Sequence, residues 1–177
     1  MKFTVTSEDE ILKEGQPVSP DGTPVGEPLF RVSLIEPEIP QNTGNIGRTC
    51  VGMNCHLDLV GELGFNITDK NLRRAGLDYW QHLTWKHFAE IPDWEQTLRT
   101  PSRVFYFSAY ATRSMYDVEY QKGDTFVFGR ETRGLPDDML QRNADRCLQI
   151  PILGPVRGYN VATSVAMVLT EAFRQVR

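Results

Sequence analysis

Short apolar segments alternate with amphipathic segments from residue 30 to the end of the chain. Their β-branched and aromatic residues predict strands at residues 30–35, 56–60, 83–88, 104–108, 125–129 and 148–152. Apolar residues at helical spacing, or helix-start signals such as Pro136, predict helices at residues 43–54, 69–75, 94–99, 137–142 and 161–176. Because strands and helices alternate, we expect an α/β fold with a mostly parallel sheet and helices on both of its faces.

The last predicted helix, residues 161–176, is apolar on more than one face. Its apolar positions at helical spacing are Val161, Val165, Val168, Leu169, Ala172, Phe173 and Val176, and the stripe is broadened by Ala162, Ala166 and Met167. A helix of this kind needs two apolar partners. The sheet is one, and a second copy of the chain is a natural other, so we predict a homodimer. A fully buried helix in a monomer is the alternative.

The first 29 residues differ from the rest of the chain because they are polar and rich in Gly and Pro turn signals. We expect residues 1–29 to form an N-terminal extension, either a flexible arm or a small hairpin, ahead of one domain at residues 30–177. A chain of 177 residues is long enough for one domain with a normal core. No apolar run approaches the roughly 18 residues of a membrane span, and no signal peptide is visible, so no membrane contact is expected.

Charge and cysteine content narrow the possible partners. The net charge of −4 argues against a general nucleic-acid coat, although local arginine clusters can still bind RNA. The cysteines Cys50, Cys55 and Cys147 form no CxxC pair and share no ligand spacing with the histidines. We therefore predict reduced thiols in a cytoplasmic protein, without a metal site.

Three loops rich in Gly, Asn and Arg each follow a predicted strand, at residues 36–50, 128–136 and 150–164. Ligands of open α/β sheets bind beyond the carboxyl ends of the strands, so the three loops predict one shared site. No GxGxxG motif is present, and Leu135 stands where a P-loop needs Lys. Taken singly, Asn42 and Asn160 could cap helices, and Glu131 could cap a helix or pair with a neighbouring arginine.

Together these loops resemble the three motifs of the SPOUT class of RNA methyltransferases. The closest match is the small TrmL group, which methylates the ribose 2′-OH of the wobble nucleotide in tRNA. The first motif is Glu36-Pro-Glu-Ile-Pro-Gln-Asn-Thr-Gly-Asn-Ile-Gly-Arg48, the second is Phe128-Gly-Arg-Glu-Thr-Arg-Gly-Leu-Pro136, and residues 171–175 match the end of the third. The resemblance covers about residues 30–177 and implies a SPOUT fold with a C-terminal deep trefoil knot.

The resemblance also implies a cofactor, S-adenosylmethionine, bound without a metal ion. In this reading the donor becomes S-adenosylhomocysteine, and it is held by Phe107, Gly129, Ile150, Gly158 and Asn160. The cofactor carries the reactive methyl group, so the protein supplies orientation and proton removal.

The residues that match the family's catalytic positions are Arg48, Asn42, Glu131 and Asn160. Related enzymes are proposed to use the arginine at the position of Arg48 for proton removal. Because the pKa of arginine lies far above neutral, positioning the ribose and phosphate is the chemically safer role. The resemblance assigns RNA contacts to Arg73, Arg74, Arg133 and Arg157.

The third motif departs from the TrmL pattern, which usually reads Arg-Ser-x-Asn-Leu-Ser-Asn. This chain has Arg157-Gly-Tyr-Asn-Val-Ala-Thr163, so its departures are Gly158, Ala162 and Thr163, and Thr170 replaces a tyrosine. Three hypotheses for the function of the chain are therefore considered. The chain methylates tRNA at the wobble ribose, or it methylates ribosomal RNA, or it is a knotted RNA-binding protein with impaired catalysis.

Overall fold

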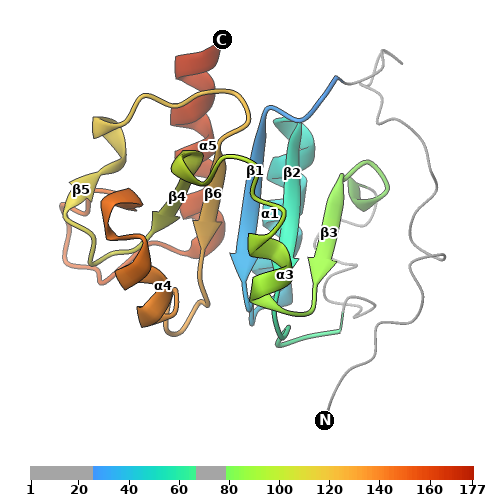
Figure 1. Ribbon diagram of the computed structural model, residues 1–177, viewed down its shortest axis with the longest axis horizontal. Coiled ribbons are helices and arrows are strands. Elements are labelled where there is room, and N and C mark those ends of the chain that lie inside the picture. Colours follow the sequence, from blue (N-terminus) through green and yellow to red (C-terminus); the bar gives the residue numbers. More distant parts are fainter. Residues whose placement is uncertain (1–25, 67–78) are drawn as a thin grey trace.

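A parallel β-sheet forms the centre of the protein in a computed structural model that describes residues 26–66 and 79–177 (Figure 1). Within these residues the strands lie in the order β3-β2-β1-β6-β4-β7-β5, and every strand pair is parallel. The strands are β1 (Phe30–Ile35), β2 (Cys55–Val60), β3 (Trp85–Phe88), β4 (Val104–Phe107), β5 (Arg113–Ser114), β6 (Thr125–Phe128) and β7 (Cys147–Gln149). The predicted parallel sheet is confirmed.

Helices cover both faces of the sheet, as predicted. They are α1 (Pro40–Gly52), α3 (Ile91–Glu95), α4 (Asp137–Arg142) and α5 (Val161–Val176), with short 3-10 turns at Pro101–Arg103, Met115–Asp117 and Ala144–Arg146. Side chains alternate along a strand, so the two faces carry separate cores. Val32 and Leu57 pack in one core with α1 and α5, whereas Ile35 and Val60 pack in the other with Trp94 and Met139.

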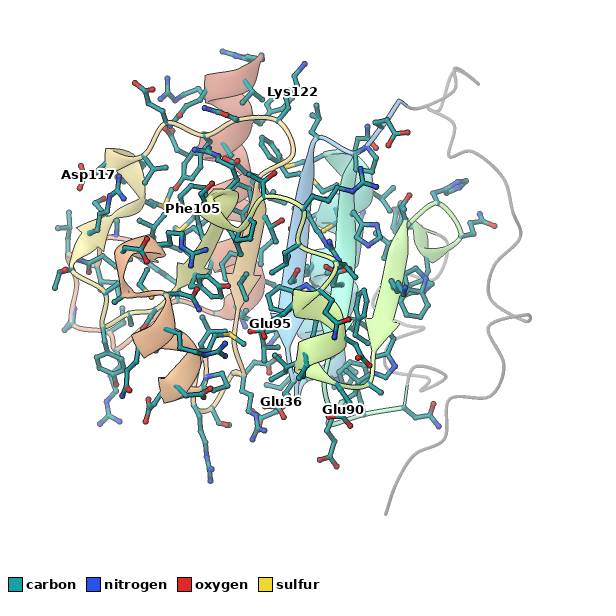
Figure 2. All side chains as sticks on the ribbon, viewed as in Figure 1. Glu36, Glu90, Glu95, Phe105, Asp117 and Lys122 are labelled. Atoms are coloured by element: carbon teal, nitrogen blue, oxygen red, sulfur yellow. The ribbon has the colours of Figure 1, made fainter. Side chains whose placement is uncertain are left out.

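Polar side chains cover the outside of this layered structure. Glu90, Asp117 and Lys122 are exposed at its periphery, whereas Phe105 is buried among the strands (Figure 2). Within residues 26–66 and 79–177, no helix is both long and apolar enough to cross a bilayer.

Several predicted boundaries need correction. Helix α1 begins at Pro40 and not at residue 43, because proline favours the first turn of a helix; its N-cap is Ile39, so the interpretation of Asn42 as the cap is wrong. For the same reason α3 begins near Pro92 and covers Ile91–Glu95 in place of residues 94–99.

The boundaries of β3 and β7 also differ from the prediction. The strand predicted at residues 83–88 is limited to Trp85–Phe88, and the last strand is Cys147–Gln149 in place of residues 148–152. The two-residue strand β5 was not predicted, because so short a segment shows no alternation. The bounds of β1, α4 and α5 agree with the prediction.

Other expectations are not tested by the strand order. The helix predicted at residues 69–75 lies outside the described residues, as does most of the N-terminal extension at residues 1–29. The deep trefoil knot concerns the threading of the chain, which strand order and register leave open, so the knot stays a prediction.

A buried carboxylate fixes α3 to the sheet. Asp58 on β2 is fully buried and accepts hydrogen bonds from Arg31, from the Ser33 hydroxyl (2.8 Å) and from the Trp94 indole (3.1 Å). The His56 ring nitrogen Nε2 lies 2.9 Å from the second carboxylate oxygen. Burial by itself would raise the pKa of Asp58, but the hydrogen bonds and charges of His56 and Arg31 outweigh it, so the pKa is lowered.

Candidate functional site

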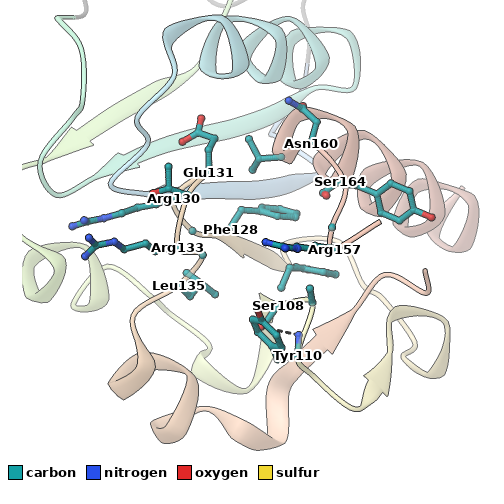
Figure 3. A pocket seen from close by; sticks show the side chains of 18 of the residues that line it. Ser108, Tyr110, Phe128, Arg130, Glu131, Arg133, Leu135, Arg157, Asn160 and Ser164 are labelled. Atoms are coloured by element: carbon teal, nitrogen blue, oxygen red, sulfur yellow. Dashed lines mark hydrogen bonds between the residues drawn. The ribbon is translucent and has the colours of Figure 1, made fainter. Parts of the chain in front are cut away.

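The loops that follow β4, β6 and β7 enclose a cavity of about 620 Å³ at the carboxyl ends of these strands (Figure 3). The first turn of α1 and the N-terminal end of α5 complete its wall, through Ile39, Asn42, Asn160 and Ser164. The volume lies within the range of small-molecule sites, roughly 300–1,000 Å³. The structure therefore brings the three predicted loops together at one edge of the sheet.

The loop after β6 is held in a tight, closed turn. The Arg130 amide donates to the Gly134 carbonyl at 3.0 Å, and the Gly134 amide donates back to the Arg130 carbonyl at 2.8 Å. Gly134 has a positive φ of 72°, which favours glycine. A Cβ at Gly129 would lie only 2.0 Å from the carbonyl carbon of Gly134. Because backbone would meet backbone, no side chain fits at Gly129.

This turn directs the Glu131 carboxylate at the N-terminus of α1. The carboxylate accepts hydrogen bonds from the amides of Glu38 (2.8 Å) and Ile39 (3.2 Å) and from the Asn42 side chain (3.0 Å). Amides at a helix N-terminus lack partners within the helix, and negative charge is favoured there. Glu131 therefore caps a helix, as one of the sequence-based interpretations held, but the alternative pairing with an arginine is wrong.

Further contacts clasp the first loop to the second. The Arg130 guanidinium donates to Glu36 at 2.9 Å, and the Thr132 hydroxyl donates to Glu38 at 2.7 Å. These bonds join residues more than 90 positions apart in the chain. We call Glu36, Glu38, Arg130, Glu131 and Thr132 the loop clasp.

The Asn42 side chain connects the loop clasp to the third loop. Its amide nitrogen donates to Glu131, and its oxygen accepts from the Asn160 side chain at 2.9 Å. The oxygen of Asn160 in turn accepts from the amides of Ala162 (2.9 Å) and Thr163 (3.4 Å), which confirms that Asn160 caps α5. The row Glu131–Asn42–Asn160 thus joins all three motifs, and each side chain has a defined orientation.

The departures from the usual third motif leave this row intact. The amides of Ala162 and Thr163 make their bonds to Asn160 through the backbone, which does not depend on their side chains. The Thr170 hydroxyl bonds to the carbonyl of Ala166 within α5. A Cβ at Gly158 would meet nothing within 4 Å, so the loop has room for a larger residue there.

One wall of the cavity is apolar. Phe107, Phe128, Leu135 and Ile150 line it, and the rings of Phe107 and Phe128 stack with their centroids 4.9 Å apart. Backbone at Gly129 and Gly158 borders the same space. An apolar wall of aromatic and aliphatic side chains beside glycine backbone suits a purine ring, so the residues present fit the adenosine part of S-adenosylmethionine.

Comparison with known proteins identifies the family. The SpoU rRNA Methylase family matches residues 29–170. The chain belongs to this family. It is 40% identical over 150 residues to a tRNA (cytidine(34)-2'-O)-methyltransferase of Saccharophagus degradans, covering 83% of this chain and 96% of that protein.

Solved structures give the same fold for this SpoU chain. One, described as giving structural insights into the 2-OH methylation of C/U34 on tRNA, is 40% identical with a TM-score of 0.79, covering 85% of this chain and 97% of that one. Another, the SpoU methyltransferase AviRb from Streptomyces viridochromogenes in complex with the cofactor AdoMet, has a TM-score of 0.72 at 21% identity, covering 89% of this chain and 61% of AviRb. At that identity the likeness to AviRb shows the fold alone.

Most of the site residues predicted from sequence line the cavity of this SpoU protein. These are Asn42, Phe107, Gly129, Glu131, Arg133, Ile150, Arg157, Gly158 and Asn160. Arg48 does not: it is exposed on α1, with its guanidinium carbon 4.5 Å from the centre of the Tyr79 ring. Arg73 and Arg74 lie outside the described residues.

Sequence reasoning missed other residues of the cavity wall. Ser108 and Tyr110 follow β4, Tyr159 belongs to the third loop, and Ser164 lies in the first turn of α5. Their position directly after a strand end or at a helix start was the signal available in the sequence. In the described part of the chain, no group of three or more His, Cys, Asp or Glu residues is arranged to hold a metal ion.

Proposed function

We propose that this SpoU-family protein is an enzyme that transfers a methyl group from S-adenosylmethionine to a ribose 2′-oxygen in tRNA, at the wobble nucleotide. The observation that carries the proposal is the Glu131–Asn42–Asn160 row beside a cavity that fits an adenosine. The tRNA methyltransferase of Saccharophagus degradans, 40% identical, supports the choice of substrate. A tRNA substrate would place the activity in the cytoplasm.

The chain's residues would supply orientation for the reaction. Bound S-adenosylmethionine provides an electrophilic methyl group, and Phe107, Gly129, Ile150 and Gly158 would hold it. Glu131 would not act as a general base, because three hydrogen-bond donors already occupy its carboxylate. Asn42 and Asn160 would fix the ribose, and Arg133 and Arg157 would bind phosphate. Arg73 and Arg74 would add RNA contacts.

Arg48 would act on the site from a distance. It lies roughly 12 Å along the helix axis from Pro40, given the 1.5 Å rise per residue of an α-helix. It does not line the cavity of its own chain. A role for Arg48 in the reaction would therefore require it to contact the RNA outside this cavity or to enter the cavity of a second copy of the chain.

Replacing Arg48 with alanine is expected to lower the methyl-transfer rate by about 100-fold or more, the scale of a lost catalytic group. The affinity for S-adenosylhomocysteine, measured by calorimetry, should stay within a few-fold, because Arg48 does not line the cavity. Arg99→Ala, which removes an exposed arginine that also lies outside the cavity wall, is the matched control and should keep full turnover. Unchanged turnover in Arg48→Ala would remove Arg48 from the mechanism.

A transfer assay tests the function as a whole. Total cellular RNA is incubated with the protein and S-adenosylmethionine labelled in the methyl group, and labelled RNA is separated by size and mapped. The proposal expects label in tRNA, on the 2′-oxygen of the wobble nucleotide. Label confined to ribosomal RNA would instead favour the second hypothesis. RNA and cofactor binding without any transfer would favour the RNA-binding protein that Gly158 and Thr163 suggest.

We also propose that the protein is a homodimer. Helices α1 and α5 lie together on one face of the sheet, and α5 leaves Met167 37% and Phe173 38% exposed. Light scattering at micromolar concentration is expected to give twice the chain mass of 20.2 kDa. A charge in an apolar interface is costly, so Phe173→Glu should lower the mass toward that of one chain. A wild-type mass of one chain would contradict the proposal.

A further inference from the structure

Tyr110 presents its ring to solvent at the mouth of the cavity. It is 93% exposed, although the aromatic residues of the preceding strand, Phe105 and Phe107, are buried. A short turn after β4 holds it there: the Ala111 amide donates to the Ser108 carbonyl at 3.3 Å, and the Tyr110 amide donates to the Ser108 hydroxyl at 3.2 Å. The backbone is thus fixed while the ring projects outward.

The Tyr110 side chain makes no specific contact within the described part of the fold. Among residues 26–66 and 79–177, the Tyr110 ring has no aromatic or cationic neighbour, and no hydrogen bond involves its hydroxyl. Large exposed apolar groups at the edge of a cavity are typical of binding surfaces. The ring therefore has a free face available for a ligand.

Positive charge borders the same cavity. Arg130, Arg133 and Arg157 line it, but Glu36 neutralises Arg130. Within the described part of the chain, Arg133 and Arg157 take part in no ion pair. In Figure 3, Tyr110 and Ser108 lie on one side of the cavity and Asn160 and Ser164 on the other, with Arg157 between them. An exposed aromatic ring beside free arginines is the combination by which proteins bind unpaired nucleotides.

We propose that Tyr110 is a substrate-positioning residue that stacks on an unpaired base of the RNA, next to the ribose held in the cavity. The inference rests on the proposed function and adds how the strand is held. We expect Tyr110 to stack on RNA and not on the cofactor. The purine of the cofactor can bind against the largely buried apolar wall at Phe107, Leu135 and Ile150, whereas Tyr110 is almost fully exposed.

Stacking of this kind sets which RNA conformation is accepted. Every base has a π-face, so a stacking contact tolerates different base identities but requires the base to be out of a duplex. Tyr110 would therefore select a looped or single strand over a paired one, without reading its sequence.

The test measures binding of a tRNA anticodon stem-loop that carries 2-aminopurine in its loop, with S-adenosylhomocysteine present. Stacking is worth about 1–3 kcal/mol per base, so Tyr110→Ala should raise the Kd for this RNA roughly 5- to 150-fold. In the same variant, Tyr110→Ala, the quenching of 2-aminopurine fluorescence by the stacked ring should also be lost. Tyr110→Phe keeps the ring and should retain both properties. Tyr116→Ala removes another exposed tyrosine, 60% exposed and outside the cavity wall, and should bind as the wild type does.

Three results would overturn the inference. The first is an unchanged Kd for the stem-loop in Tyr110→Ala. The second is an equal loss of affinity for S-adenosylhomocysteine, which would place the ring in the cofactor site. The third is a change in oligomeric mass, which would place it between subunits. Absence of methyl transfer by the wild-type protein would instead overturn the proposed function, because the binding assay does not depend on transfer.

Discussion

Gly129→Ala is expected to abolish cofactor binding, raising the Kd for S-adenosylhomocysteine by at least about 100-fold. The added Cβ would lie 2.0 Å from the carbonyl carbon of Gly134 and 2.2 Å from the amide nitrogen of Leu135. Neither atom belongs to a flexible side chain, so the turn itself must open. Opening the turn would move Glu131 away from the amides of Glu38 and Ile39 and so separate the loops that form the cavity. Calorimetry with S-adenosylhomocysteine measures the effect.

Gly154→Ala is the matched control for this substitution. Gly154 lies in the third loop, does not line the cavity, and has open space where a Cβ would be added. Its affinity for S-adenosylhomocysteine should match that of the wild type. Wild-type affinity in Gly129→Ala would show that the turn tolerates a side chain. The close approach of Gly129 to the backbone of Gly134 would then not be required for cofactor binding.

Asp58→Asn is expected to lower the midpoint of thermal unfolding by roughly 6–20 °C. Breaking a buried charge pair by removing one partner costs about 3–5 kcal/mol, and each kcal/mol shifts the midpoint by about 2–4 °C in a chain of this size. An asparagine cannot accept from Arg31, Ser33, Trp94 and His56 at once without turning its own NH₂ group toward a donor. Differential scanning calorimetry at neutral pH measures the change.

The effect of this substitution should depend on pH. The pKa of Asp58 is lower in the folded protein than its ordinary value of 3.8. The carboxylate therefore contributes its full stability above about pH 4, the unfolded value, and loses it as the pH falls through the folded pKa. The difference between wild type and Asp58→Asn should accordingly shrink below pH 4.

Asp145→Asn serves as the control for both measurements. The Asp145 carboxylate is 76% exposed and lies 3.5 Å from Arg146, and exposed pairs of this kind contribute about 0–1 kcal/mol. Its unfolding midpoint should stay close to that of the wild type at every pH. An Asp58 variant as stable as Asp145→Asn would contradict the stabilising role of the buried cluster.

The elements that could be predicted from sequence are those whose signals are local. Helix α5 combines apolar spacing with a capping asparagine, and α4 follows a proline, so both were placed at the correct residues. Helix α1 was predicted to begin too late because Asn42 resembles a cap, which outweighed the local signal of Pro40 at the first turn. The group that lies at its N-terminus is Glu131, 93 residues away from Glu38 in the chain. Nothing in the sequence around Pro40 reveals that partner.

The candidate site likewise has features that the sequence identified and others that only the structure shows. Motif residues such as Asn42, Glu131 and Asn160 were identified by resemblance, but their arrangement in one hydrogen-bonded row required the structure. Tyr110 was missed because its importance comes from an exposed ring at the cavity mouth, and exposure depends on how β4 ends and turns. Asp58 was missed because a single buried acid in a strand carries no motif.

The bond from Asn160 to Asn42 joins residues 118 positions apart, which has a consequence for protein synthesis. Domains fold as units while the chain is made, and the N-terminal parts emerge first. Asn42 therefore leaves the ribosome well before Asn160, and its bond to the third loop can form only after Asn160 has emerged. A translation product truncated before Ile150 would lack the third loop, the Asn160 cap and helix α5, which contributes to the core around α1. Such fragments would expose apolar surface, which makes them natural substrates for chaperones and proteases.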